Sequence, residues 1–120
     1  FDDKKDDKTT ISDTKKLIES IHDELPLAHI YYFGIEPRTY AAGSLSLETT
    51  LKLLNNINTQ IKEFISKLTY ITYLDSPSYF YNEDKTVNAS MFRDGVHPAL
   101  ENYSIYTNLL LEAGLDIKNK

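Results

Sequence analysis

An aspartate and a histidine stand three positions apart, Asp94 and His97, within the segment "FRDGVHPALENY". In serine-dependent acyl transfer, a histidine takes the proton of the nucleophile, and a carboxylate holds the other ring N–H and stabilises the imidazolium. Gly95 permits the tight turn that such a pair needs, and Pro98 suits the start of a helix. An alternative stays open, because Asp-Gly is a common turn dipeptide and Asp94 could simply satisfy helix N–H groups.

Two apolar segments predict the strands that would position this pair. "HIYYFGI" at residues 29–35 and "YITYLD" at 70–75 lack polar alternation, which is typical of strands covered on both faces. A long helix is predicted between them, with Ser46 as its N-cap. Its apolar stripe keeps three-and-four spacing at Leu47, Leu51, Leu54, Ile57, Ile61, Phe64, Ile65 and Leu68. Strand, helix and strand together predict a parallel βαβ unit.

Further helices are predicted on either side of this unit. The first covers residues 12–24, and the last runs from Pro98 to Gly114. We expect the last helix to bury a stripe made of Leu100, Tyr103, Tyr106, Leu109 and Leu110. Residues 1–10 are dense in charge and predict a solvated loop or a frayed start, and residues 76–97 predict irregular structure.

Two parallel strands leave unpaired backbone groups at both outer edges, so they do not make a stable sheet alone. We therefore expect additional strands, supplied either by another chain or by a segment upstream of residue 1. Self-association through an exposed strand edge is the expected consequence if that segment is missing. In such sheets ligands bind outside the carboxyl ends of the strands, and Asp94 and His97 follow the last predicted strand.

The order "ELPLAHIYYFGIEPR", long helix, "YITYLD" and "FRDGVHPALENY" resembles the C-terminal portion of the SGNH/GDSL hydrolase family. The resemblance covers residues 12–110 and implies an α/β fold, the flavodoxin-like three-layer parallel-sheet fold of that family. Residues 1–120 would then be the C-terminal part of one domain, with two parallel strands and flanking helices. Asp94 and His97 match the family's Asp-x-x-His block. The chain departs from the family pattern at Asn102, where a glycine usually precedes the tyrosine.

The resemblance implies an esterase, lipase or acylhydrolase in which His97 is the general base and Asp94 orients it. The nucleophilic serine and the Gly and Asn blocks of the oxyanion hole would precede residue 1, so the chain alone is expected to be inactive. "AGSLSL" at residues 42–47 does not replace that serine block, because Ser46 is predicted to cap the helix. The implied substrate is an ester or an acetylated sugar or lipid. No cofactor or metal is required.

Two other functions are compatible with the same residues. One is a catalytically incomplete interaction module that docks on another protein through an open strand edge. The other is a nucleotide- or phosphate-binding domain, which is disfavoured because no Gly-rich loop follows either predicted strand.

The composition disfavours nucleic acid as a partner and does not predict a membrane-spanning segment. Acidic residues outnumber basic residues 18 to 13, giving a net charge of −5, and no basic stripe suggests nucleic acid as a partner. No apolar run is long enough to predict a transmembrane segment. The chain has no cysteine, so redox chemistry leaves the compartment undetermined.

Several other residues are functional candidates. His22, His29 and His97 fall on separate predicted elements without the spacing of metal ligands, which favours surface or packing roles. Turn formation is the favoured role for Glu36 and Pro37, after the first predicted strand, and for Asp75, after the second. Solvent exposure is favoured for Arg38 and Tyr40. Aromatic packing is favoured for Tyr70, Tyr73 and the "YFY" segment at 79–81.

Overall fold

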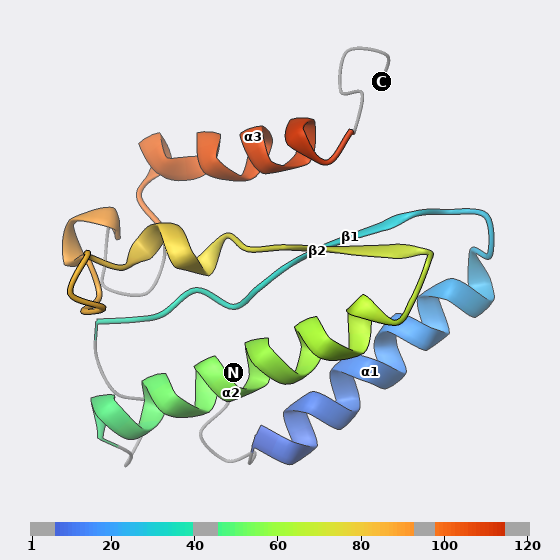
Figure 1. Ribbon diagram of the computed structural model, residues 1–120, viewed down its shortest axis with the longest axis horizontal. Coiled ribbons are helices and arrows are strands. Elements are labelled where there is room, and N and C mark those ends of the chain that lie inside the picture. The colour runs from blue at the N-terminus through green and yellow to red at the C-terminus, as the bar shows by residue number, and fades with distance from the viewer. Residues whose placement is uncertain (1–6, 40–45, 93–97, 115–120) are drawn as a thin grey trace. The chain divides into compact units, whose positions relative to one another are not determined.

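The computed structural model describes residues 7–39, 46–92 and 98–114 (Figure 1). It is an α/β structure, as predicted, and its described parts contain two strands that run parallel. The N–H of Ile30 bonds to the carbonyl of Tyr70, and the N–H of Gly34 bonds to that of Leu74. This constant offset is the pattern of a parallel pair. The main elements are α1 (Asp7–Glu24), β1 (Ile30–Phe33), α2 (Leu47–Ser66), β2 (Ile71–Leu74) and α3 (Ser104–Glu112).

Helix α1 begins earlier than predicted. Residues 7–10 are helical, so the prediction of a solvated loop or frayed start is wrong for them, whereas residues 1–6 lie outside the described residues. The Asp7 carboxylate accepts the N–H of Lys8 at 3.0 Å and the Nδ2 of Asn56, on α2, at 2.6 Å. A carboxylate is also favoured in the first turn by the helix dipole. The contact with Asn56 could not be read from local sequence.

The first of two compact units comprises Phe1–Tyr32 and Ala41–Tyr73, and its helices α1 and α2 lie side by side (Figure 1). The predicted cap of α2 is confirmed, since Ser46 Oγ accepts the N–H of Thr49 at 3.1 Å. One face of α2 is buried at helical spacing, as the pattern predicted. The buried apolar side chains of this unit are Ile18, Leu54, Ile57, Ile61, Ile65 and Ile71.

The strands are less covered than the sequence predicted. All four residues of β1 are only half-buried, and in β2 only Ile71 and Leu74 are buried. Within the described parts of the chain, β1 and β2 pair with each other in a two-stranded sheet. Each strand therefore has, within the described residues, one edge without a neighbouring strand.

The second unit comprises Phe33–Tyr40 and Leu74–Lys120. Short 3₁₀ turns follow β2 along the chain, namely η1 (Pro77–Phe80), η2 (Ala89–Met91) and η3 (Leu100–Tyr103), and α3 follows them. The region predicted to be irregular thus contains two 3₁₀ turns and an isolated antiparallel bridge between Tyr81 and Val87.

The predicted buried stripe of the last helix is wrong for Leu100 and Tyr103, whereas Tyr106, Leu109 and Leu110 are half-buried. Helix α3 begins at Ser104, and none of its residues is fully buried. Leu100 and Tyr103 are 67% and 45% exposed. They lie in η3, where residues three apart are eclipsed on one side, so the periodicity of an α-helix does not apply. The predicted terminal glycine is confirmed, because Gly114 has a φ of 95° and donates to the carbonyl of Leu111.

Candidate functional site

Asp94 and His97 lie in the segment 93–97, which is outside the described residues. The residues on either side of that segment are described. Phe92 and Pro98 form an isolated antiparallel bridge, so the chain that enters the segment is paired with the chain that leaves it. The predicted catalytic pair therefore stands between two residues that the backbone brings together.

Two hydrogen bonds to the carbonyl of Met91 add to the pairing of Phe92 with Pro98. It accepts the N–H of Ala99 at 2.9 Å and the Nδ2 of Asn102, also at 2.9 Å. Asn102 is the residue at which the sequence departs from the family pattern it resembles, and its side chain makes a specific contact there.

An aromatic pair supports the entrance of the segment. Phe80, the last residue of η1, is fully buried, and its ring centroid lies 5.2 Å from that of Phe92. Phe92 is itself buried, with 7% of its surface exposed. The backbone N–H of Asn88 donates to the carbonyl of Phe80 at 2.8 Å, so η1 is also bonded to the chain that leads toward Phe92.

A polar group not expected from the sequence lies in the same unit. The hydroxyl of Ser76, which directly precedes η1, donates to Oε1 of Glu36 at 2.8 Å, and Ser76 is completely buried. The Tyr106 phenol, on α3, is also influenced electrostatically by the Glu36 carboxylate. We call Glu36, Ser76 and Tyr106 the Glu36 cluster.

The electrostatics of the cluster keep Tyr106 as a hydrogen-bond donor. Burial, followed by the neighbouring Glu36 carboxylate, raises the pKa of Tyr106 above its ordinary value. The Tyr106 ring also meets the Phe33 ring edge to face, with centroids 5.0 Å apart. Phe33 ends β1, so the cluster and its aromatic support both stand at the carboxyl end of a strand, where parallel sheets place their functional groups.

Sequence analysis assigned Glu36 to a turn and Tyr106 to a core stripe, and it missed their contact. One available signal was the position of Glu36, directly after an apolar strand and before Pro37, a residue that is fully buried. Nothing in the spacing links it with Ser76, which is 40 positions away.

The two described histidines have packing or surface contacts. The His22 ring stacks on Tyr70 with centroids 3.6 Å apart and 8° between the planes, and its Nδ1 is buried without a hydrogen-bond partner. The ring of His29 shares a hydrogen bond of 2.7 Å with the hydroxyl of Thr72. Across the described ranges, no three His, Cys, Asp or Glu side chains gather as metal ligands would.

The structure does not bring Arg38, Asp75 and Tyr79 together at a site. Asp75 is exposed, and its backbone carbonyl accepts the hydroxyl of Ser78, which agrees with the predicted turn role. Tyr79 is 50% exposed, whereas Phe80 between the two tyrosines is buried. Arg38 is half-buried, and Tyr40 lies outside the described residues.

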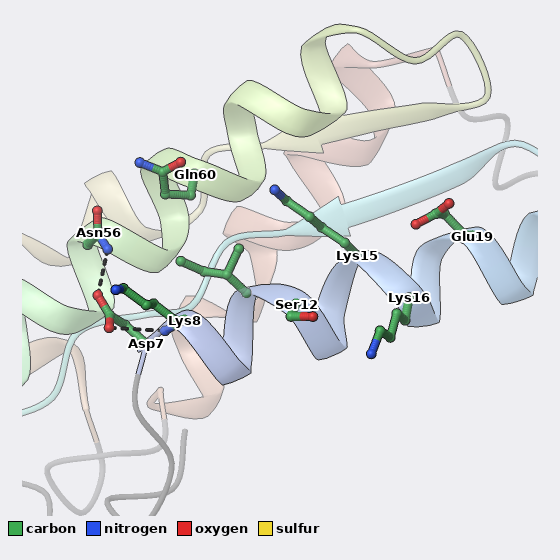
Figure 2. Close-up of a pocket in the computed structure, with 9 residues that line it drawn as sticks. Asp7, Lys8, Ser12, Lys15, Lys16, Glu19, Asn56 and Gln60 are labelled. Carbon is green, nitrogen blue, oxygen red and sulfur yellow. Dashed lines mark hydrogen bonds between the residues drawn. The ribbon is translucent and has the colours of Figure 1, made fainter.

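A pocket of about 550 Å³ lies between α1 and α2 in the first unit (Figure 2). Lysine, carboxylate and amide side chains line it, and the Asp7 carboxylate is already bonded to Asn56 and to the backbone of Lys8. Lys15 places its Nζ 5.3 Å from the centroid of the Phe64 ring. The charges are mixed and no nucleophile and base are paired here, so we do not take this pocket as the reaction site.

Comparison with known proteins finds a likeness among solved structures. No family model matches the chain, and no curated protein matches it either. A solved structure described as "a putative platelet activating factor from Streptococcus pneumonia" is similar, with a TM-score of 0.71 and 18% identity over 89% of this chain. The match covers 51% of the other chain, so this chain spans about half the length of the structure it resembles. At that identity the likeness concerns the fold.

Among the helices in the described ranges, none is both long and apolar enough to cross a bilayer.

Proposed function

We propose that the protein is a serine ester hydrolase resembling the SGNH/GDSL family, in which His97 is the general base and Asp94 orients it. The proposal is carried by the position of the Asp-x-x-His segment. It follows β2, precedes α3, and is flanked by the paired residues Phe92 and Pro98. In α/β domains, reactive groups lie in the parts of the chain that follow the carboxyl ends of parallel strands. The fold likeness to the Streptococcus pneumonia structure supports the same class.

In the proposed reaction, a serine from a segment ahead of residue 1 attacks the ester carbonyl while His97 takes its proton. The tetrahedral intermediate expels the alkoxide, which receives that proton from His97, and an acyl-serine remains. Water then attacks the acyl-serine by the same proton transfers in reverse order, releasing the acid and restoring the serine. Asp94 holds the His97 tautomer and stabilises the imidazolium in both steps.

The proposed substrate is an ester, an acetylated sugar or an acetylated lipid. The description of the structural neighbour as a platelet activating factor is loosely compatible with a lipid as the substrate. No metal or organic cofactor takes part in this scheme, since the serine, histidine and carboxylate together supply the nucleophile and the proton transfers.

The test uses the full-length gene product with p-nitrophenyl acetate and a fluorophosphonate probe. We expect hydrolysis and labelling of one serine in the wild type. His97→Ala and Asp94→Asn should each lower kcat about 10⁴-fold, because either change removes base catalysis from the nucleophile. His29→Gln is the matched control, since that histidine bonds Thr72 in the other unit, and its activity should equal that of the wild type.

Full activity in His97→Ala would remove His97 from the mechanism. A full-length protein that neither hydrolyses the ester nor takes up the probe would favour the interaction module instead. The observation behind that second candidate is the sheet itself, in which, over the described residues, β1 and β2 pair only with each other.

A further inference from the structure

We propose that the pocket between α1 and α2 binds a small soluble phosphate ester, with the phosphate group held by lysines of α1. Both helices belong to the first unit, and the proposal does not depend on the esterase activity proposed above. The pocket has a volume of about 550 Å³, within the range of small-molecule sites. It therefore has room for the organic part of such an ester as well as for its phosphate.

The lysines that line the pocket have no carboxylate partner. Lys8, Lys15 and Lys16 all line it, and across the described residues none of them forms an ion pair. Lys52 of α2, which does not line the pocket, is by contrast paired with the carboxylate of Glu48 at 3.3 Å. Three cations without a counter-charge make this pocket attractive to anions, even though the net charge of the chain is −5.

The two carboxylates of the lining have other surroundings. Asp7 accepts the Nδ2 of Asn56 at 2.6 Å. Glu19 stands four residues after Lys15, and a helical ion pair is weaker in this order, with the cation nearer the N-terminus. Lys15 reaches toward α2 instead, with its Nζ 5.3 Å from the centroid of the Phe64 ring (Figure 2). A cation–π contact leaves the N–H groups of an ammonium able to donate to a ligand.

One row of α1 brings hydrogen-bond donors together. Lys8, Ser12 and Lys15 follow one another at intervals of four and three residues, so they are neighbours along the helix surface. Gln60 lines the pocket from α2 (Figure 2). Over the described residues, the Ser12 hydroxyl and the Gln60 amide have no hydrogen-bond partner. Two ammonium groups, a hydroxyl and an amide thus supply several donors for the oxygens of one phosphate.

The order of charges along α1 indicates the chemical class of the ligand. Three lysines against two carboxylates leave the pocket with a net charge of +1, and Asp7 and Glu19 stand at the two ends with the lysines between them. A phosphate monoester carries a charge of about −1.5 to −2 at pH 7, more than a single carboxylate, and lysine is a common phosphate ligand. Carboxylates only accept hydrogen bonds, so the ends of the pocket suit hydroxyl groups of the organic part. The ligand is therefore a phosphate ester of a hydroxylated molecule.

Isothermal titration calorimetry of the full-length gene product with glucose 6-phosphate tests the proposal. We expect saturable binding with a Kd below about 1 mM, and no binding of glucose, which lacks the group that the lysines recognise. Vesicles that contain phosphatidic acid present a phosphate monoester on a lipid surface. We expect no binding to them, because the helices α1 and α2 wall the pocket and a bilayer surface does not enter between them. Binding to the vesicles without binding of glucose 6-phosphate would overturn the assignment to a soluble ester.

Substitutions of single lysines locate the binding site. Lys8→Gln and Lys15→Gln each remove one charged donor, and each should raise the Kd for glucose 6-phosphate about tenfold. Lys15→Arg keeps the positive charge and should bind within about threefold of the wild type. Lys52→Gln, at an exposed lysine of α2 outside the pocket, is the matched control and should leave the Kd unchanged. Circular dichroism establishes that each variant is folded before it is titrated.

The results that would overturn this site differ from those that would overturn the esterase. A folded wild-type protein that does not bind glucose 6-phosphate, or that binds glucose equally well, would refute the phosphate site. Equal Kd values for Lys8→Gln, Lys15→Gln and Lys52→Gln would place the binding elsewhere on the molecule and would refute it too. A protein that binds glucose 6-phosphate through these lysines but does not hydrolyse p-nitrophenyl acetate would refute the esterase alone.

Discussion

The Tyr106 phenol gives the second unit a predictable response to alkaline pH. Its pKa is raised in the folded protein, first by burial and then by Glu36, whereas in the unfolded chain it ionises near its ordinary value of about 10. A group whose pKa is raised by folding contributes stability that is complete below the unfolded pKa and is lost as pH rises above it. The contribution of Tyr106 should therefore decline above about pH 10.

We expect the free energy of unfolding to fall less between pH 9 and pH 11 in Tyr106→Phe than in the wild type, because phenylalanine has no proton to lose. Urea unfolding at a series of pH values measures this difference. Tyr79→Phe serves as the control, since that side chain is 50% exposed. Identical slopes for wild type and Tyr106→Phe would contradict a raised pKa at Tyr106.

Individual residues show where sequence reasoning succeeds and where it stops. Ser46 was predicted as a cap and is one, because a cap depends on its own neighbours along the chain. Glu36 was predicted to form a turn, and its contact with Ser76 stayed hidden, because it joins residues 40 positions apart. The roles of Asp94 and His97 remain predictions from spacing and family resemblance, since both lie outside the described residues.

At the scale of the element, the N-cap of α2 should make a measurable contribution to the free energy of unfolding. Ser46 Oγ accepts the N–H of Thr49, one of the donors that the first turn of a helix leaves without a partner. We expect Ser46→Ala to lower the free energy of unfolding by about 1 kcal/mol, and Ser46→Asp to retain most of it because aspartate caps equally well. Urea unfolding near neutral pH measures both variants.

Ser66→Ala is the control for that prediction. Ser66 is exposed at the other end of α2 and donates to the carbonyl of Glu63, so its loss leaves no buried donor without a partner. A loss of stability in Ser66→Ala equal to that in Ser46→Ala would show that capping is not what the first variant measures.

The helices also show why one element was predicted better than another. Helix α2 has a cap, a long apolar face and 20 residues, so local signals agree over its whole length. Helix α3 has only 9 residues and follows a 3₁₀ turn, so the apolar spacing that predicted a single buried stripe crosses two helix types. Burial in α3 depends on what packs against it, and periodicity alone does not supply that.

At the scale of the whole molecule, the order of elements was predicted correctly and the cover of the sheet was not. Apolar strands around an amphipathic helix predicted an α/β chain with parallel pairing, and the structure has both. The four residues of β1 are all half-buried, so its continuous apolar sequence did not predict its burial.

The two-stranded sheet formed by the described residues leads to a prediction about residues 1–120 expressed alone. Two-stranded sheets are marginal in water, and an unpaired parallel edge presents a row of backbone donors and acceptors to other chains. We expect this chain to self-associate, so that its mass by light scattering after gel filtration rises with concentration, whereas the full-length gene product keeps a constant mass. The isolated chain should also hydrolyse p-nitrophenyl acetate no faster than buffer, because the proposed scheme takes its serine from another segment. A monomer at every concentration would show that the strand edges are protected within residues 1–120, and ester hydrolysis by that monomer would place the nucleophile inside this chain.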